Sequence, residues 1–398
     1  MSRRAIVLLA SALLSACSWF GGDDKVVIAS LVDLPEQPVV LHDLWSRGVG
    51  DQGAAELWLM LTPALAGEAI YAANVDGHVT AMDRNNGKVL WTQALDVSLM
   101  SAVGASDKLV LVADRDGAVY ALNTADGEQV WRGQATSEVL AAPTTDGDVV
   151  IVQSTDSRVR AFDALTGAIR WTYSAPQALL TLRGTAAPVI RDGVVYVAFN
   201  TGKAVALDAR TGQLRWEQHF IVSEGRSELE RVIDVHAEPL LVGPYVFIGS
   251  FQGAVVSLNR ESGRPEWSEK ASTLRSMAEG EGNLYVVEND DTVRALSLVS
   301  GREVWKSALF SGRQLTAPAV LGGYVAVADF EGYIHLLKQS DGSYVGRYNV
   351  GGDGVRMKLQ SEGDSLYVLT NSGKLWALSV KKEDAKPSIW PSIFQWGK

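Results

Sequence analysis

The sequence contains a single cysteine, Cys17, among its 398 residues. One cysteine cannot form a disulfide within the chain, and it cannot supply the several thiolates of a cysteine-ligated zinc or iron–sulfur site. Clustered basic residues are also missing, because the formal net charge is -10 and no basic run exceeds a dipeptide. Phosphate affinity depends on clustered Lys and Arg, so we expect no nucleic-acid partner. The five histidines show no metal-ligand spacing and there is no phosphate loop, so we expect no metal and no cofactor.

The sequence has no run of 18 uninterrupted apolar residues, the length that a membrane-spanning helix needs. It opens with MSRR and the short apolar run AIVLLASALLSA, which is the layout of an export signal over residues 1–16. The end of that run, LLSAC, resembles the lipobox of bacterial lipoproteins. The resemblance implies acylation of Cys17 and, with Ser18 following, an outer-membrane anchor that faces the periplasm. The alternative is an ordinary secreted protein with an incidental cysteine.

A nine-residue pattern recurs along the chain, as in NTADGEQVW (123–131) and DALTGAIRW (163–171). Each copy combines an Asx-type turn, a glycine suited to positive φ and a Trp on the following strand. Two β-like segments separated by a short turn precede each copy, which makes eight units. The complete copies end at Trp91, Trp131, Trp171, Trp216, Trp267 and Trp305, in steps of 40, 40, 45, 51 and 38 residues.

Units of about 40 residues with four strands have the spacing of propeller blades. We therefore predict an all-β, eight-bladed propeller of four-stranded antiparallel blades over residues 31–380, with a linear β-solenoid as the alternative. The seventh copy has Gly346 in place of Trp and the eighth has neither residue. Trp45, in VVLHDLW, precedes the first complete blade, so we predict that this N-terminal strand completes the last blade and closes the ring. Residues 17–30 are expected to form a lipidated tether, and residues 381–398 a flexible tail.

The repeated A-L-D-x-x-T-G-x-x-x-W units resemble those of pyrroloquinoline-quinone-type propellers. Along nearly the whole mature chain the sequence is similar to one branch of that group, the BamB family of outer-membrane lipoproteins. The resemblance depends on the lipobox, the eight units, residues 62–83 and two insertions, LLTLRGTAAPV (179–189) and RSELERVIDVHAEPLLV (226–242). It implies a non-enzymatic scaffold that binds the periplasmic domains of BamA, together with other subunits of the β-barrel assembly complex. Nascent outer-membrane proteins are further candidate partners.

The two longest steps between repeats coincide with these insertions, and extra residues in a repeat array form loops on one face. An apolar–Arg loop there is typical of an interface, although Leu180 and Leu182 are equally consistent with the core of a strand. The resemblance implies that BamA binds the Leu-x-Leu-Arg segment and an Asp-x-Asp segment. In this chain the corresponding residues are Leu180, Leu182, Arg183, Asp234 and His236. His236 replaces the second Asp, and its role is therefore in doubt. Residues 224–231 are expected to form a solvated helix within the second insertion.

Two other functions remain open from the sequence. One is a quinone-dependent dehydrogenase. Enzymes of that class resemble this propeller, but they often carry a vicinal disulfide, which a chain with one cysteine cannot form. The other is a propeller that binds polysaccharide or peptide in its channel. An enzyme site or a sugar site would need polar and aromatic groups that converge in the central funnel.

Overall fold

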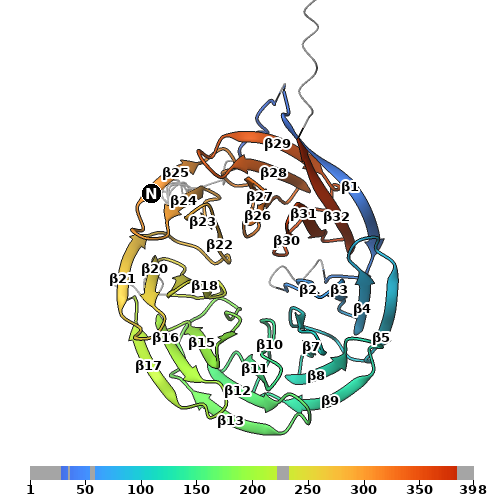
Figure 1. Ribbon diagram of the computed structural model, residues 1–398, viewed down its shortest axis with the longest axis vertical. Coiled ribbons are helices and arrows are strands. Elements are labelled where there is room, and N and C mark those ends of the chain that lie inside the picture. The colour runs from blue at the N-terminus through green and yellow to red at the C-terminus, as the bar shows by residue number, and fades with distance from the viewer. Residues whose placement is uncertain (1–27, 35, 54–58, 222–232, 383–398) are drawn as a thin grey trace, which may run out of the picture.

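The computed structural model describes residues 28–34, 36–53, 59–221 and 233–382. Within these ranges the chain forms eight four-stranded antiparallel sheets, arranged as a ring around a central opening (Figure 1). The predicted all-β, eight-bladed propeller is therefore confirmed, and a linear solenoid is excluded. The expected signal peptide (1–16), Cys17, the loop helix (224–231) and most of the tail lie outside the described residues. The described part includes no helix of the length and apolar character needed to cross a membrane.

The first seven blades each consist of four consecutive strands, ordered from the centre of the ring to its rim. Their bounds, blade by blade, are β2 (Ala64–Ala66), β3 (Ala69–Ala73), β4 (His78–Asp83) and β5 (Val89–Ala94); β6 (Gly104–Ala105), β7 (Leu109–Ala113), β8 (Ala118–Asn123) and β9 (Gln129–Gln134); β10 (Thr144–Thr145), β11 (Val149–Gln153), β12 (Arg158–Asp163) and β13 (Ile169–Ser174); β14 (Val189–Arg191), β15 (Val194–Phe199), β16 (Lys203–Asp208) and β17 (Leu214–His219); β18 (Leu240–Val242), β19 (Tyr245–Gly249), β20 (Ala254–Asn259) and β21 (Pro265–Lys270); β22 (Ala278–Gly280), β23 (Asn283–Val287), β24 (Val293–Ser297) and β25 (Glu303–Ser307); and β26 (Ala319–Leu321), β27 (Tyr324–Ala328), β28 (Tyr333–Lys338) and β29 (Tyr344–Asn349).

The eighth blade joins the two ends of the described chain. Its three inner strands are β30 (Gln360–Glu362), β31 (Ser365–Leu369) and β32 (Lys374–Lys382), and its outermost strand is β1 (Val39–Gly48). β1 runs antiparallel to β32, from Val39 opposite Lys382 to Gly48 opposite Lys374. The predicted closure by an N-terminal strand is thus confirmed. β32 extends to Lys382, past the boundary at residue 380 that the sequence suggested.

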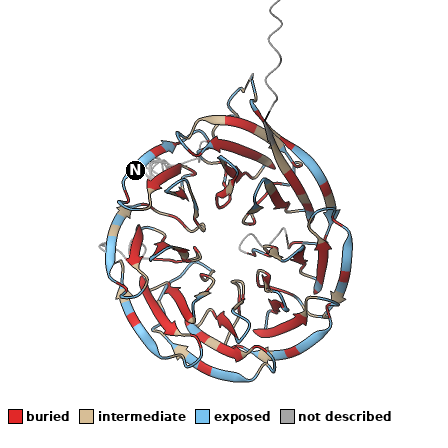
Figure 2. Ribbon diagram, in the orientation of Figure 1, coloured by how far each residue is buried: buried red, intermediate tan, exposed pale blue. Residues whose placement is uncertain are grey.

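The middle strands of each blade form the core, because both of their faces are covered by neighbouring blades (Figure 2). β11, with the sequence VVIVQ, is buried throughout. β-branched residues suit this doubly covered position, since they pack well on a pleated surface. The outermost strands alternate instead, and in β13 the Trp is buried while most of its neighbours are exposed. The core is consequently a series of layers between blades rather than one central cluster.

The repeat tryptophans connect each blade to the next. Trp91 donates from Nε1 to the carbonyl of Thr124 at 2.8 Å, and its ring covers Gly127, where an added Cβ would lie 2.5 Å from the ring. Trp45 makes the same connection across the closure, because its Nε1 donates to the carbonyl of Arg84 at 2.9 Å. The same bond to the following blade is made by Trp131, Trp171, Trp216, Trp267 and Trp305.

The seventh blade lacks the Trp because the incoming N-terminal segment occupies its place. A Cβ at Gly346 would lie 2.5 Å from the carbonyl oxygen of Val39. Upstream of Val39, the segment follows β29, where the Arg347 amide donates to Gln37 Oε1 at 3.3 Å. Ala29 donates its N–H to the carbonyl of Ser311 at 2.8 Å, so the described end of the expected tether lies against the propeller.

Candidate functional site

The described parts of both insertions lie on one face of the ring. The connections from the rim of one blade to the centre of the next lie there, together with the hairpins between second and third strands; we name it the connection face. A hydrogen bond from the Phe251 amide to the Asp234 carbonyl, at 2.8 Å, joins such a hairpin to such a connection. The insertions form the connections before β14 and before β18.

The first insertion exposes a short apolar loop. Leu179, Leu180 and Leu182 are 95%, 50% and 41% exposed, and all three lie outside any strand. The reading of Leu180 and Leu182 as strand core is therefore wrong. Arg183 follows on the same loop and its side chain is 46% exposed. Apolar side chains beside an exposed Arg are the composition of an interface hot spot.

Asp234 lies beneath this loop and does not reach its surface. The side chain is fully buried, and its Oδ2 accepts a hydrogen bond from the backbone N–H of Leu182. Oδ1 has no hydrogen-bond partner within the described residues. Burial raises the pKa of the Asp234 carboxyl to about 6. The buried Asp234 is thus placed to hold the backbone of the loop, and its expected part in binding BamA stays a prediction.

His236 packs against the same loop at Gly184. Burial lowers the pKa of its imidazole to about 4, so the ring is neutral near pH 7. A Cβ added at Gly184 would lie 2.6 Å from His236 Nε2, which shows that the ring rests against the glycine backbone. Asn200, between β15 and β16, joins the two insertions: its Nδ2 donates to the Gly184 carbonyl at 3.2 Å, and its Oδ1 accepts from the Val235 amide at 3.0 Å.

Sequence reasoning missed Asn200 and Gly184. Asn200 stands in the turn NTG, which looked like one of eight equivalent hairpin turns. Arg183 forms an ion pair with Glu138 Oε1 at 2.7 Å. Both side chains are partly exposed, so this pair stabilises the loop by about 0–1 kcal/mol.

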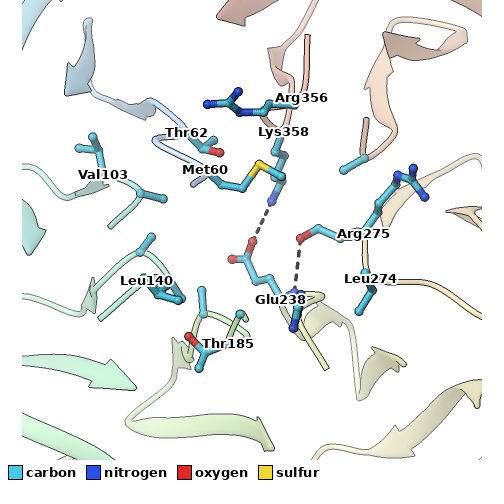
Figure 3. A pocket seen from close by; sticks show the side chains of 18 of the residues that line it. Met60, Thr62, Val103, Leu140, Thr185, Glu238, Leu274, Arg275, Arg356 and Lys358 are labelled. Carbon is cyan, nitrogen blue, oxygen red and sulfur yellow. Dashed lines mark hydrogen bonds and ion pairs between the residues drawn. The ribbon is translucent and has the colours of Figure 1, made fainter. Parts of the chain in front are cut away.

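A central cavity of about 810 Å³ opens beside the loop (Figure 3). Leu182 and Arg183 belong to its lining, which otherwise consists mainly of small and aliphatic residues. Glu238 and Lys358 form an ion pair at 2.7 Å between two connections. The described lining residues include no Phe, Tyr or Trp, and the imidazole of His236 is their one aromatic ring. The described residues include no cluster of His, Cys, Asp and Glu suited to a metal.

Comparison with known proteins identifies the family. A family model described as outer membrane protein assembly factor BamB matches residues 75–307 and 289–386. The proteins of that name from Pseudomonas aeruginosa and Marinobacter adhaerens are 45% and 48% identical over 377 residues. These alignments cover 95% and 94% of this chain and 98% and 96% of the relatives.

Solved structures agree on the fold. The crystal structure of BamB from Moraxella catarrhalis matches with a TM-score of 0.77 at 23% identity, covering 85% of this chain and all of that one. A quinohemoprotein alcohol dehydrogenase from Comamonas testosteroni matches with a TM-score of 0.66 at 14% identity, over 87% of this chain and 77% of its own. The likeness to these solved structures shows the propeller fold alone, whereas the alignments with the sequence relatives cover nearly the whole chain. The chain belongs to the family of the outer membrane protein assembly factor BamB.

Proposed function

We propose that this protein is a non-enzymatic scaffold of outer-membrane protein assembly, which binds the periplasmic domains of BamA through the connection face. An acylated Cys17 would anchor it to the outer membrane on the periplasmic side, since two or more acyl chains give stable anchoring. Other subunits of the assembly complex and nascent outer-membrane proteins are further partners under this proposal.

The observation that supports the proposal most directly is the preorganised loop at Leu180, Leu182 and Arg183. Its apolar side chains are exposed while its backbone is held by the buried Asp234. A loop that is already ordered loses less conformational entropy on binding, so its exposed apolar area contributes more to affinity. An exposed apolar loop with an ordered backbone is typical of a docking surface rather than of a mobile linker.

The cavity lining favours a scaffold over a quinone-dependent enzyme. A flat aromatic cofactor or a sugar ring would be expected to stack on Phe, Tyr or Trp, and the described lining includes none of these three residue types. Glu238 is the one carboxylate in that lining, and it is already paired with Lys358. These features support a binding role for the molecule.

Capture of BamA from detergent-solubilised envelopes tests the proposal. The bait would be the intact protein or the triple variant Leu180→Ala/Leu182→Ala/Arg183→Ala. The matched control is Leu165→Ala/Val299→Ala/Arg264→Ala, which changes two exposed aliphatic residues and one arginine. These three residues lie on the opposite face of the ring, in turns that join the third and fourth strands of their blades.

We expect capture by the intact protein and the control, and loss of capture by the triple variant, with all three folded by circular dichroism. No capture by the intact protein would refute the scaffold function. Equal capture by all three would refute the assignment of the loop while leaving BamA as the partner.

A further inference from the structure

The described chain begins with residues 28–34, a segment that we name the strap. The strap belongs to no strand, but its first side chains alternate: Ala29 and Leu31 are partly buried, whereas Ile28 and Ser30 are exposed. Successive side chains of an extended chain point to opposite sides. The strap therefore lies extended on the propeller, with one side against it.

The start of the strap is bound to the connection between the sixth and seventh blades, residues 308–318. The N–H of Ala29 donates to the Ser311 carbonyl at 2.8 Å, and the Ala29 carbonyl accepts from Arg313 Nη1 at 3.1 Å. Both backbone polar groups of Ala29 thus have partners in one connection. Two bonds to one residue fix the position at which the preceding chain leaves the propeller.

Arg313 is held ready for this contact by buried groups of the seventh blade. Its Nε donates to Asp329 Oδ2 at 2.7 Å, and it also forms an ion pair with Glu331. Asp329 is fully buried and lies 3.0 Å from Nε2 of the buried His335. These bonds fix the guanidinium, so little side-chain freedom is lost when it binds the strap. Hydrogen bonds from a charged donor are stronger than those between neutral groups.

A second arginine holds the middle of the strap. Arg347, on β29, donates from Nη1 to the Val32 carbonyl at 3.2 Å. Its guanidinium lies 5.4 Å from the centre of the Tyr333 ring, an arrangement that favours this side-chain position. The strap is consequently bound at two points, one beside the sixth blade and one on the rim of the seventh.

The exit point of the chain lies on the connection face. Arg313 belongs to a rim-to-centre connection, and its carbonyl accepts from the amide of Phe330, in the hairpin between β27 and β28, at 3.2 Å. Connections and hairpins of this kind define that face. The loop at Leu180, Leu182 and Arg183 lies on the same face of the ring.

The strap shortens the reach of a lipid anchor. An extended chain spans at most about 3.3–3.6 Å per residue. From Cys17 to Val39, where β1 begins, that limit is about 75 Å. From Cys17 to the fixed Ala29 it is about 40 Å. A reach of about 75 Å would leave either face of the ring free to turn toward the membrane, whereas the shorter reach starts from the connection face alone.

We propose that the strap sets the orientation of the propeller at the membrane: it holds the lipid anchor beside the sixth and seventh blades, so that the connection face lies nearer the membrane than the opposite face. This inference rests on the acylated Cys17 of the proposed function. It turns the proposed BamA-binding loop, on the same face, toward the membrane.

The test measures energy transfer from a dye on the protein to a labelled lipid. The acylated full-length protein is bound to phosphatidylcholine vesicles that contain a rhodamine-labelled lipid as acceptor. The donor dye is attached to one introduced cysteine: Asp353→Cys, in the connection after β29, or Ser340→Cys, in the turn between β28 and β29 on the opposite face. Both positions are exposed, and the acylated thiol of Cys17 does not react with the dye.

A strap variant and a matched control complete the design. The strap variant is Ala29→Pro/Arg347→Met, which removes the donors to the Ser311 and Val32 carbonyls. The control is Ala29→Gly/Arg302→Met, which keeps the N–H of residue 29 and removes an exposed arginine from the turn between β24 and β25. Circular dichroism checks folding, and flotation with the vesicles checks anchoring.

We expect stronger transfer from position 353 than from position 340 in the intact protein and in the control. The strap variant should float equally well but lose this difference, because its anchor can then reach either face. Chymotrypsin cleavage after Leu31 should be about tenfold faster in the strap variant, since 1.4 kcal/mol of lost protection corresponds to a factor of ten.

Equal transfer from the two positions of the vesicle-bound intact protein, or stronger transfer from position 340, would overturn the proposal whatever the variants do. A folded strap variant that keeps the difference, or that is cleaved no faster after Leu31, would overturn it as well. Intact protein that fails to float would refute the acylated anchor itself, a result that flotation separates from a wrong orientation.

Discussion

The carboxylate of Asp234 accepts a hydrogen bond from the backbone N–H of Leu182, although 52 residues separate them in the chain. This contact joins the two insertions below the exposed loop, and Asn200 adds a second connection between them. The surface that Leu180, Leu182 and Arg183 present thus depends on residues that a bound partner would not touch. This arrangement separates the residues of the site into those that contact and those that position.

Replacing Asp234 distinguishes these two roles. Asp234→Ala leaves the part-buried Leu182 amide without its acceptor, a loss of about 1–3 kcal/mol. The loop should therefore loosen, and capture of BamA should fall. Asp234→Asn keeps an acceptor oxygen, so capture should be largely preserved. Hydrogen exchange of the Leu182 amide should accelerate by about 10–100-fold in the Ala variant, since 1.4 kcal/mol corresponds to a factor of ten. Equal loss of capture in both variants, with slow exchange in the Asn variant, would show that the charge itself contacts the partner.

Asp234 and His236 should give opposite dependences of stability on pH. Burial raises the Asp234 pKa from 3.8 to about 6. Between pH 4 and 6 the folded state therefore holds a proton that the unfolded chain has lost, and acidification favours folding. Burial lowers the His236 pKa from 6.5 to about 4, so in that window the unfolded chain holds the extra proton and acidification disfavours folding. Each effect is on the order of 3 kcal/mol, and the two largely cancel.

Single variants should reveal each half of this balance. Relative to the intact protein, the unfolding free energy of Asp234→Asn should fall as the pH drops from 6.5 to 4.5, and that of His236→Gln should rise. Urea unfolding at the two pH values measures both changes. Identical pH dependence in the two variants and the intact protein would show that neither group is buried as described.

The sequence repeat made the blades predictable, whereas only some residues of the candidate site could be predicted from the sequence. The eight recurring units of β-like segments and turns predicted the number of blades, and the unpaired Trp45 predicted the closure, because both are consequences of a regular array. Asp234 was identified as a site residue, but a carboxylate in a lengthened connection looks the same in sequence whether it faces solvent or a buried amide. Irregular connections have no period that would indicate direction.

Contacts between residues of different connections could not be predicted from the sequence for the same reason. Nothing in the sequence relates Lys358 to Glu238, because the ring brings the fifth and eighth blades together only after it closes. Asn200 looked like an ordinary turn residue. Gly346, by contrast, was noticed as a departure from the repeat, and the structure supplies the reason: the Val39 backbone passes where a Trp would stand.

Gly184→Ala should disturb the loop without changing any polar group. The added Cβ would lie 2.6 Å from Nε2 of His236, too close for the ring to stay where it is. We expect displacement of the loop and weaker capture of BamA. Gly352→Ala is the matched control, because it lies in another connection with nothing within 4 Å of an added Cβ. Equal capture by Gly184→Ala and Gly352→Ala would show that the loop tolerates a shift of His236.

Trp45→Ala should open the ring at its closure. Trp45 packs between the last and first blades, beside Tyr367 at 6.2 Å between ring centres, and donates to the Arg84 carbonyl. Loss of a buried Trp costs about 3–5 kcal/mol, and here the loss falls on the contact that holds β1 to the first blade. Limited proteolysis should therefore release the N-terminal segment from Trp45→Ala. Trp131 makes the equivalent contact between the second and third blades, away from the closure. Trp131→Ala should therefore be destabilised by a similar amount in urea but keep the N-terminal segment protected. Because the two variants remove the same side chain, equal protection of the N-terminal segment in both would mean that pairing of β1 with β32 closes the ring without the Trp.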